Sequence, residues 1–90
     1  MTLIAVRMKI MPKSPESEMA EIQKQVGEIL HGFDVRKPDF VIEPIAFGLK
    51  ALIMMFGWPE DRELEELEHK LLKIHHVGSV EVLDIRRAIG

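Results

Sequence analysis

Histidines and carboxylates are the side chains of this chain that could do acid–base or metal chemistry. The four histidines are His31, His69, His75 and His76. A metal site needs three or four ligands that converge on one point, whereas His69 and His75 stand nearly two helical turns apart. His75 and His76 come at the end of an expected helix, where an imidazolium complements the helix dipole. The spacing therefore favours capping and packing, and we predict no metal site.

The carboxylates gather in one acidic stretch, Glu63, Glu65, Glu66 and Glu68, which is typical of the solvated face of a helix. No serine stands in a nucleophile-elbow motif, and no glycine-rich phosphate-binding loop is present. The absence of cysteine excludes a thiol nucleophile, a zinc finger and a disulfide scaffold. We therefore expect a protein that is not an enzyme, with no catalytic residues, no cofactor and no stable nucleotide binding of its own.

Two features remain that suit contact with another macromolecule. The first is the pair Phe47-Gly48, which interrupts two apolar runs in the stretch IEPIAFGLKAL. The tip of a hairpin faces water and usually carries small or polar residues. Phe47 must therefore either fold back into the core or present its ring to something else. The second feature is Arg86-Arg87 near the end of the chain, for which a solvated strand end is the simplest interpretation.

The first half of the chain predicts a strand and then a helix. Residues 3–11 alternate between an apolar face and a mixed face, the period of a half-buried strand. We expect Ser14 to cap a helix whose first turn holds Pro15 and Glu16, and Gly32 to end it in the left-handed conformation. The apolar stripe of this helix comprises Met19, Ile22, Val26 and Ile29.

A second and a third strand follow, joined by a hairpin at Phe47-Gly48. Residues 33–46 predict a weak strand, which should lie at a sheet edge because Pro38 and Pro44 cannot donate ladder hydrogen bonds. Residues 49–56 are apolar on both faces, as in a central strand.

The last part of the chain predicts a second helix and a final strand. Pro59, Glu60 and Asp61 are expected to open this helix, since acidic side chains favour the positive end of the helix dipole. Gly78 is expected to close it, and residues 79–87 form a short last strand. The buried stripe comprises Leu64, Leu67, Leu71 and Ile74.

The element order is strand, helix, strand, strand, helix, strand. With right-handed crossovers in both halves, this order predicts an α+β fold, the ferredoxin-like α/β plait, with a four-stranded antiparallel sheet and both helices on one face. The first and third strands are then central, and the second and fourth strands are edges. At 90 residues the chain fits a single domain, residues 1–90.

Composition narrows the functional classes. With 47% hydrophobic and 30% charged residues, the chain is typical of a folded globular protein. Its net charge of −3 argues against direct nucleic-acid binding unless a local basic patch forms. The longest apolar run, residues 51–58, is too short to cross a bilayer, and the N-terminus has no signal-peptide pattern. We therefore expect a cytoplasmic protein with no membrane partner.

Small plaits of this kind also include regulatory domains that bind small molecules. Such a domain would need a pocket with converging polar groups, and no sequence pattern indicates one. A scaffold role is a third alternative. An RNA-recognition domain shares the topology but stacks bases on aromatic residues of its central strands, and the first strand here has no aromatic residue.

Three segments resemble one family: MKIMPKSPE, EPIAFGLKAL and VGSVEVLDIRR. They are similar to the archaeal translation elongation factor 1-beta family, the guanine nucleotide exchange factor for elongation factor 1-alpha, and the similarity covers essentially the whole chain. The resemblance implies the plait fold and a GTPase partner. It also implies that promotion of GDP release and GTP reloading during translation elongation is the function.

The resemblance also implies which residues contact the partner. In the family, the aromatic residue that matches Phe47 wedges against the GTPase beside its nucleotide site, and its neighbours here are Pro44, Ala46, Gly48 and Lys50. Eukaryotic members have glycine at the position of Ala46. They also carry a C-terminal lysine that disturbs the magnesium site. A simple register places Gly90 opposite that lysine, and the nearest cations in this chain are Arg86 and Arg87.

Overall fold

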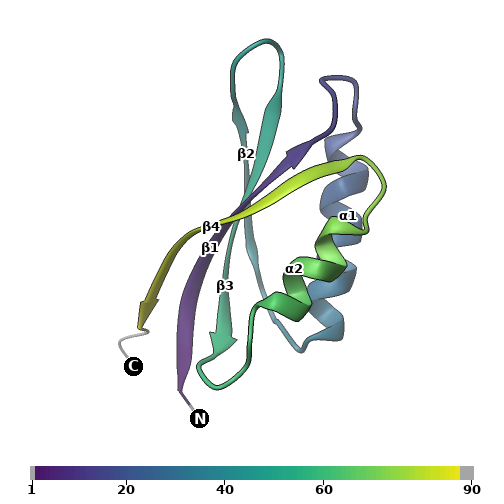
Figure 1. Cartoon of the computed structure of the whole chain (residues 1–90). Helices are drawn as coiled ribbons and strands as arrows, with labels where there is room; N and C mark the ends of the chain where they lie inside the picture. The colour runs from purple at the N-terminus through teal and green to yellow at the C-terminus, as the bar shows by residue number, and fades with distance from the viewer. Residues whose placement is uncertain (1, 88–90) are drawn as a thin grey trace.

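Four antiparallel strands and two helices make up the fold in the computed structural model, which describes residues 2–87 (Figure 1). The strands form one sheet in the order β2-β3-β1-β4, and both helices lie against the same face of it. This confirms the ferredoxin-like plait, with two central and two edge strands as predicted. The bounds are β1 Leu3–Pro12, α1 Met19–Gly32, β2 Asp39–Pro44, β3 Lys50–Pro59, α2 Glu65–Leu72 and β4 Val77–Arg87.

The core lies between the helices and the sheet, and it is built from alternate residues of the two central strands. Each even-numbered residue of β1 pairs with an even-numbered residue of β3, so both side chains point toward the helices. The helices meet them along one stripe each. In α1 this stripe is turned slightly from the predicted one, because Leu30 is fully buried whereas Ile29 is only partly buried. The side chains with no more than 1% exposure are Val6, Met8, Ile10, Ile22, Val26, Leu30, Leu52, Met54, Trp58, Leu67 and Leu71.

The edge position of β2 explains why it can contain a proline, Pro44. Ile45 donates its N–H to the carbonyl of Leu49 at 2.7 Å. Because bonded and non-bonded pairs alternate along an antiparallel ladder, Pro44, which faces Lys50, directs its nitrogen away from β3. The proline therefore costs no ladder hydrogen bond, and it also prevents another strand from pairing at this edge.

The predicted start of α1 is wrong, whereas its predicted end at Gly32 is confirmed. The helix begins at Met19, with Glu18 as its N-cap and no side-chain cap hydrogen bond. Ser14 instead closes a separate turn, in which its carbonyl accepts the N–H of Ser17 at 3.2 Å. At the other end, the left-handed conformation belongs to Asp34 (φ 64) and not to Gly32. Aspartate tolerates this conformation better than most residues.

Three boundaries in the second half also differ from the prediction. β2 begins only at Asp39, after a loop, whereas residues 33–46 were expected to be extended. β3 continues to Pro59, because Trp58 occupies the next inward position and is fully buried. Pro59, Glu60 and Asp61 consequently do not open a helix, and α2 begins at Glu65.

Gly78 does not end α2 but lies in β4, which begins at Val77. The turn before β4 is made by His76, whose φ is 75. A Cβ at Gly78 would lie 3.2 Å from the carbonyl oxygen of Pro12 and 3.4 Å from the Cα of Lys13. Gly78 therefore favours the close approach of β4 to the end of β1 and does not serve as a helix C-cap.

An aromatic cluster ties the loop after β3 to the loop after α1. Trp58 donates its Nε1–H to the carbonyl of Arg62 at 2.8 Å, and Arg62 donates Nη1–H to the carbonyl of Phe33 at 2.9 Å. The guanidinium carbon lies 5.5 Å from the centroids of both rings. Charge-assisted hydrogen bonds and cation–π contacts together hold these two loops in place.

Two glycine substitutions test the backbone assignments. We expect Gly27→Ala to raise stability by about 0.5–1 kcal/mol, because this glycine lies inside α1 and a Cβ there meets nothing within 4 Å. We expect Gly78→Ala to lower stability by roughly 1 kcal/mol or more, as overpacking does. The backbone that it would strike cannot easily move, because Lys13 N–H bonds to His76 C=O at 2.8 Å.

Thermal and urea unfolding of the two variants and the parent measure both effects. Equal stabilities for the two variants would contradict the placement of Gly78 against β1.

Candidate functional site

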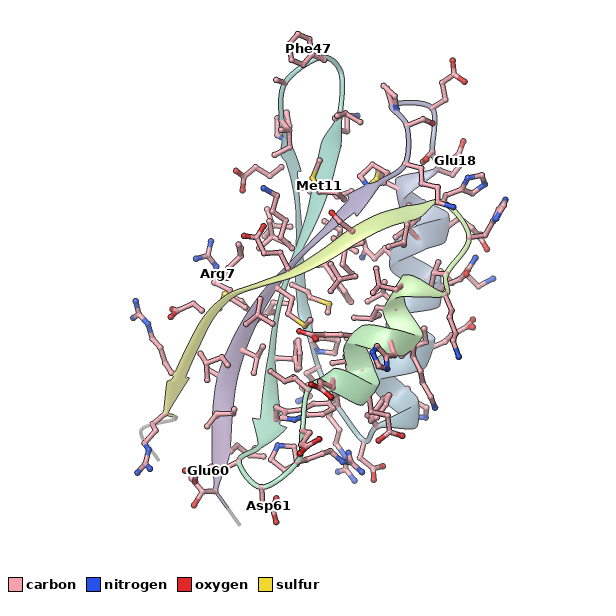
Figure 2. The ribbon with its side chains drawn as sticks, in the orientation of Figure 1. Arg7, Met11, Glu18, Phe47, Glu60 and Asp61 are labelled. Carbon is pink, nitrogen blue, oxygen red and sulfur yellow. The ribbon has the colours of Figure 1, made fainter. Side chains whose placement is uncertain are left out.

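Phe47 stands at the tip of the β2–β3 hairpin and is 94% exposed, the most exposed large hydrophobic side chain among residues 2–87 (Figure 2). Leu49 donates its N–H to the carbonyl of Ala46 at 3.1 Å across the turn. Phe47 and Gly48 have φ values of 59 and 77. The ring therefore does not fold back into the core, which settles the first of the two alternatives that the sequence left open.

The backbone at the tip is unfavourable for a bulky residue. Positive φ at two successive central residues is the pattern of a type I′ turn, whose preferred sequence is Asn-Gly. Gly48 satisfies this preference, whereas Phe47 does not. A non-glycine residue held in the left-handed region costs of order 1–3 kcal/mol. Phe47 thus strains the turn and contributes nothing to the core, so neither local preference nor packing accounts for its presence.

The hairpin tip is supported on one side by the loop between β1 and α1. A Cβ placed on Gly48 would lie 3.8 Å from the Cβ of Pro15, so this loop runs directly beside the turn. A shallow depression of about 360 Å³ separates the same loop from the start of β3, and Lys50, Glu16 and Glu18 are among its lining residues. The tip is therefore held at a defined position relative to the sheet.

Five of the residues carried over from the family lie together at this end of the molecule. Phe47 and its neighbours in the turn are all exposed, and Pro44 and Lys50 face each other at the base of the hairpin. Two further apolar side chains that had not been predicted as part of the site, Ile42 of β2 and Ile45 directly after it, are also exposed beside the tip. Their only signal was an apolar character on both faces of a proline-bounded strand. The five carried-over residues are Pro44, Ala46, Phe47, Gly48 and Lys50.

Arg86 and Arg87 lie at the opposite end of the sheet. Arg87 faces Ile4 at the start of β1, and its Nη2 lies 3.1 Å from Oε1 of Glu60. Arg86 donates Nε–H to Oδ2 of Asp84 at 2.8 Å. Both arginine side chains are 81% exposed.

The two arginines and the hairpin tip therefore form two separate patches. The ten residues of β3 separate the hairpin tip from the arginine end, and a rise of about 3.3 Å per residue makes this roughly 30 Å. Figure 2 shows Phe47 at one end of the molecule and Glu60, the partner of Arg87, at the other.

Metal binding and membrane insertion can be examined for the residues that the structure describes. Between Thr2 and Arg87, no group of three or more His, Asp or Glu side chains is placed to hold a metal ion. The rings of His75 and His76 lie 3.9 Å apart in the turn before β4. No helix among these residues is long and apolar enough to cross a membrane.

A depression of about 590 Å³ lies at the end of the sheet remote from Phe47. Its charged lining is mixed, with two arginines and two aspartates, and Arg62 is already bonded to the Phe33 carbonyl. It therefore presents no set of polar groups of one sign converging on a ligand. Its charged residues are Asp34, Arg36, Asp61 and Arg62.

Comparison with known proteins identifies close relatives along the whole chain. Residues 5–88 match the family model of the EF-1 guanine nucleotide exchange domain. Elongation factor 1-beta of Methanosarcina barkeri is 38% identical over 86 residues, covering 93% of this chain and 96% of that protein. The proteins of the same name from Methanocaldococcus jannaschii and Thermofilum pendens are each 34% identical, covering 98% and 100% of this chain and 100% of their own lengths.

A solved structure shares the fold alone. The chain titled BlrP1 BLUF superposes with a TM-score of 0.57 at 14% sequence identity, covering 98% of this chain and 56% of that one. At this identity the likeness supports the arrangement of strands and helices and says nothing of function.

Phe47→Asn tests whether the ring is dispensable for folding. Asparagine tolerates the left-handed region and suits the turn, so we expect the variant to be more stable than the parent by about 1 kcal/mol. In a domain of this size that gain raises Tm by roughly 4–8 °C. Differential scanning calorimetry measures the shift.

The control is Phe56→Ala, which removes a buried ring from β3. It should cost about 3–5 kcal/mol, as core phenylalanines do. Destabilisation of Phe47→Asn on the scale of Phe56→Ala would contradict an exposed position for the Phe47 ring.

Proposed function

Because this chain belongs to the family of EF-1 guanine nucleotide exchange domains, we propose that it promotes the release of GDP from elongation factor 1-alpha and its reloading with GTP. The proposal treats residues 1–90 as one exchange domain that acts in the cytoplasm during translation elongation. The chain itself then binds no nucleotide stably and carries out no covalent chemistry. The match over residues 5–88 supports this proposal more strongly than any single residue does.

An exchange factor works by coupled binding equilibria. A GTPase holds GDP through its phosphate loop and a magnesium ion. A factor that binds the nucleotide-free GTPase more tightly than the GDP-bound form must weaken GDP binding by the same ratio, because coupling between two sites is reciprocal. Such a factor needs a rigid contact that only the nucleotide-free form accommodates well. An acid, a base or a nucleophile would add nothing.

Phe47 is the residue that best fits this requirement. Its ring is 94% exposed on a turn whose backbone is restricted, and large aromatic side chains dominate the binding energy of protein interfaces. Because the turn is already ordered by the hydrogen bond between Leu49 and Ala46, little conformational entropy is lost when the ring enters a pocket of the partner. In this proposal Phe47 wedges against the GTPase beside its nucleotide site.

The arginine end supplies a second, separate contact. Arg86 and Arg87 lie roughly 30 Å from Phe47 by the length of β3, so one small pocket of the GTPase cannot receive both patches. We assign them a role at the rim, where exposed charges speed association. Gly90, which a simple register places opposite the eukaryotic lysine, lies outside the described residues.

GDP release tests the proposed activity directly. We expect catalytic amounts of the protein to accelerate the loss of labelled GDP from elongation factor 1-alpha in the presence of excess free nucleotide. Phe47→Asn should lower the exchange efficiency by roughly 30-fold or more, the equivalent of an interface hot spot of about 2 kcal/mol. Stopped-flow fluorescence of a labelled nucleotide gives both rates.

The matched control is Leu72→Asn, which removes an exposed apolar side chain from α2 and should leave exchange unchanged. Release unaffected by the parent protein at any concentration would refute the exchange activity and favour a regulatory or scaffold role. A fully active Phe47→Asn would refute only the role of the ring.

Arg86→Ala tests the second contact. We expect a reduction of roughly 2- to 10-fold in the association rate with the GTPase at low salt, and a weaker salt dependence, because exposed charges act through steering. The dissociation rate should change little. Surface plasmon resonance at several salt concentrations separates the two rates.

The double variant Phe47→Asn with Arg86→Ala should show additive losses, within about 0.3–0.5 kcal/mol, because distant sites act independently. Strong non-additivity would mean that the two ends contact one element of the partner. A large rise in dissociation caused by Arg86→Ala alone would make Arg86 a buried anchor.

A further inference from the structure

The two edges of the sheet are protected to very different degrees. β2 is six residues long and ends in Pro44, whose nitrogen faces outward and blocks pairing with another strand. β4 is the other edge, is eleven residues long, and contains no proline. A long edge strand with unpaired N–H and C=O groups is a template for pairing with a further strand.

The direction of the hydrogen bonds shows which residues of β4 face the open side. Glu60 donates its N–H to the carbonyl of Thr2 at 3.0 Å, so the even-numbered residues of β1 bond toward β3. The odd-numbered residues of β1 must then bond toward β4, because bonded and non-bonded pairs alternate along the ladder. The bond from Lys13 N–H to His76 C=O, at 2.8 Å, fits this assignment.

The same alternation leaves the backbone of Ile85 without a hydrogen-bond partner among residues 2–87. Arg86 and Asp84 of β4 face Ala5 and Arg7, so the backbone groups of both form hydrogen bonds with β1. Ile85, which lies between them, directs its N–H and C=O away from the sheet. Its side chain is 50% exposed, because it lies on the helix-covered face but beyond the reach of the helices.

The sequence around Ile85 is complementary to itself when it is read in the opposite direction. The segment is Leu83-Asp84-Ile85-Arg86-Arg87. If two copies pair antiparallel about a twofold axis at Ile85, each Asp84 faces Arg86 of the other copy, and the two isoleucines face each other. Paired opposite charges and paired branched side chains both stabilise neighbouring strands, and the axis at Ile85 also pairs its two free backbone groups.

We propose that β4 pairs edge to edge with β4 of a second copy of this chain, antiparallel and centred on Ile85, to form a continuous eight-stranded sheet. A second copy of the chain is the partner that fits this edge, because its own Asp84 and Arg86 are complementary to Arg86 and Asp84 of the first copy. Only about five residues of each strand take part, so the interface falls below the size of stable complexes. The dimer is therefore weak and forms reversibly with concentration.

The pairing does not depend on the proposed exchange function. Its effect on exchange rests on the proposed function. A dimer would cover Arg86 and Arg87 and would compete with any contact that these residues make with a GTPase. Mass, and not exchange activity, is therefore the measurement that tests the pairing.

Sedimentation equilibrium of the full chain from about 10 μM to about 1 mM covers the range in which a small interface becomes populated. We expect the average mass to rise toward twice the monomer mass. Ile85→Lys places two like charges at the twofold axis and should hold the protein at the monomer mass throughout. The matched control is Val41→Lys on the protected edge β2, where the side chain is 61% exposed; it should dimerise like the parent.

Charge reversal tests the register. Asp84→Arg and Arg86→Asp, made singly, put like charges opposite each other and should weaken the dimer at least 10-fold, whereas the double reversal should restore it. In the unmodified protein, the amide of Ile85 should exchange its hydrogen more slowly as concentration rises, a result that needs no variant to fold. A protein monomeric at 1 mM, a Val41→Lys variant that fails to dimerise, or a double reversal that fails to restore the dimer would each overturn the proposal.

Discussion

The register between β1 and β3 is the constraint on which the rest of the structure depends. It pairs Ile4 with Trp58, Val6 with Phe56 and Met8 with Met54, so that the large apolar side chains of both central strands point to the same face of the sheet. A slip by one residue would turn every one of these side chains toward water. Because the helices cover only this face, the hydrophobic stabilisation of the entire domain depends on that one register.

The same register determines what happens at the two ends of β3. At one end Trp58 takes an inward position and its Nε1–H holds the following loop through the Arg62 carbonyl. At the other end, the turn at Phe47 and Gly48 connects β2 to β3 and lies outside the core. A ring that is not part of the core is therefore carried on the turn that leads into a central strand. A strained residue that packing does not require is a common mark of a functional position.

The two edge strands, β2 and β4, differ in how open they are to pairing with another strand. Pro44, at an outward-facing position of β2, prevents another strand from pairing at the end of this edge next to the hairpin. β4 has no such protection and ends in charged residues that alternate with exposed apolar ones. The proposed contact surface at the hairpin and the proposed pairing surface at the opposite end can coexist in so small a domain, because the length of β3 separates them.

Element types and the strand order could be predicted from the sequence, because alternation in residues 3–11, the stripes of both helices and the edge prolines are local patterns that the sheet then obeys. Several boundaries could not be predicted. Ser14, Pro59 and Gly78 all have the chemistry of helix ends, yet long-range contacts placed them in a turn, at the end of a strand and in a strand. Burial of Trp58 outweighed the helix-opening tendency of Pro59-Glu60-Asp61, since burying a large side chain stabilises more than a favourable helix start does.

At the site, the sequence was enough to single out Phe47. It is an aromatic residue beside a glycine, between two apolar runs, in a segment that resembles the exchange-factor family. The exposure of the Phe47 ring and the position of Arg86 and Arg87 at the far end of the sheet could be seen only in the three-dimensional structure. The physical reason is that exposure and distance depend on which strands pair and on how far each extends beyond the helices. No pattern within a single segment contains that information, because pairing joins residues that lie far apart in the chain.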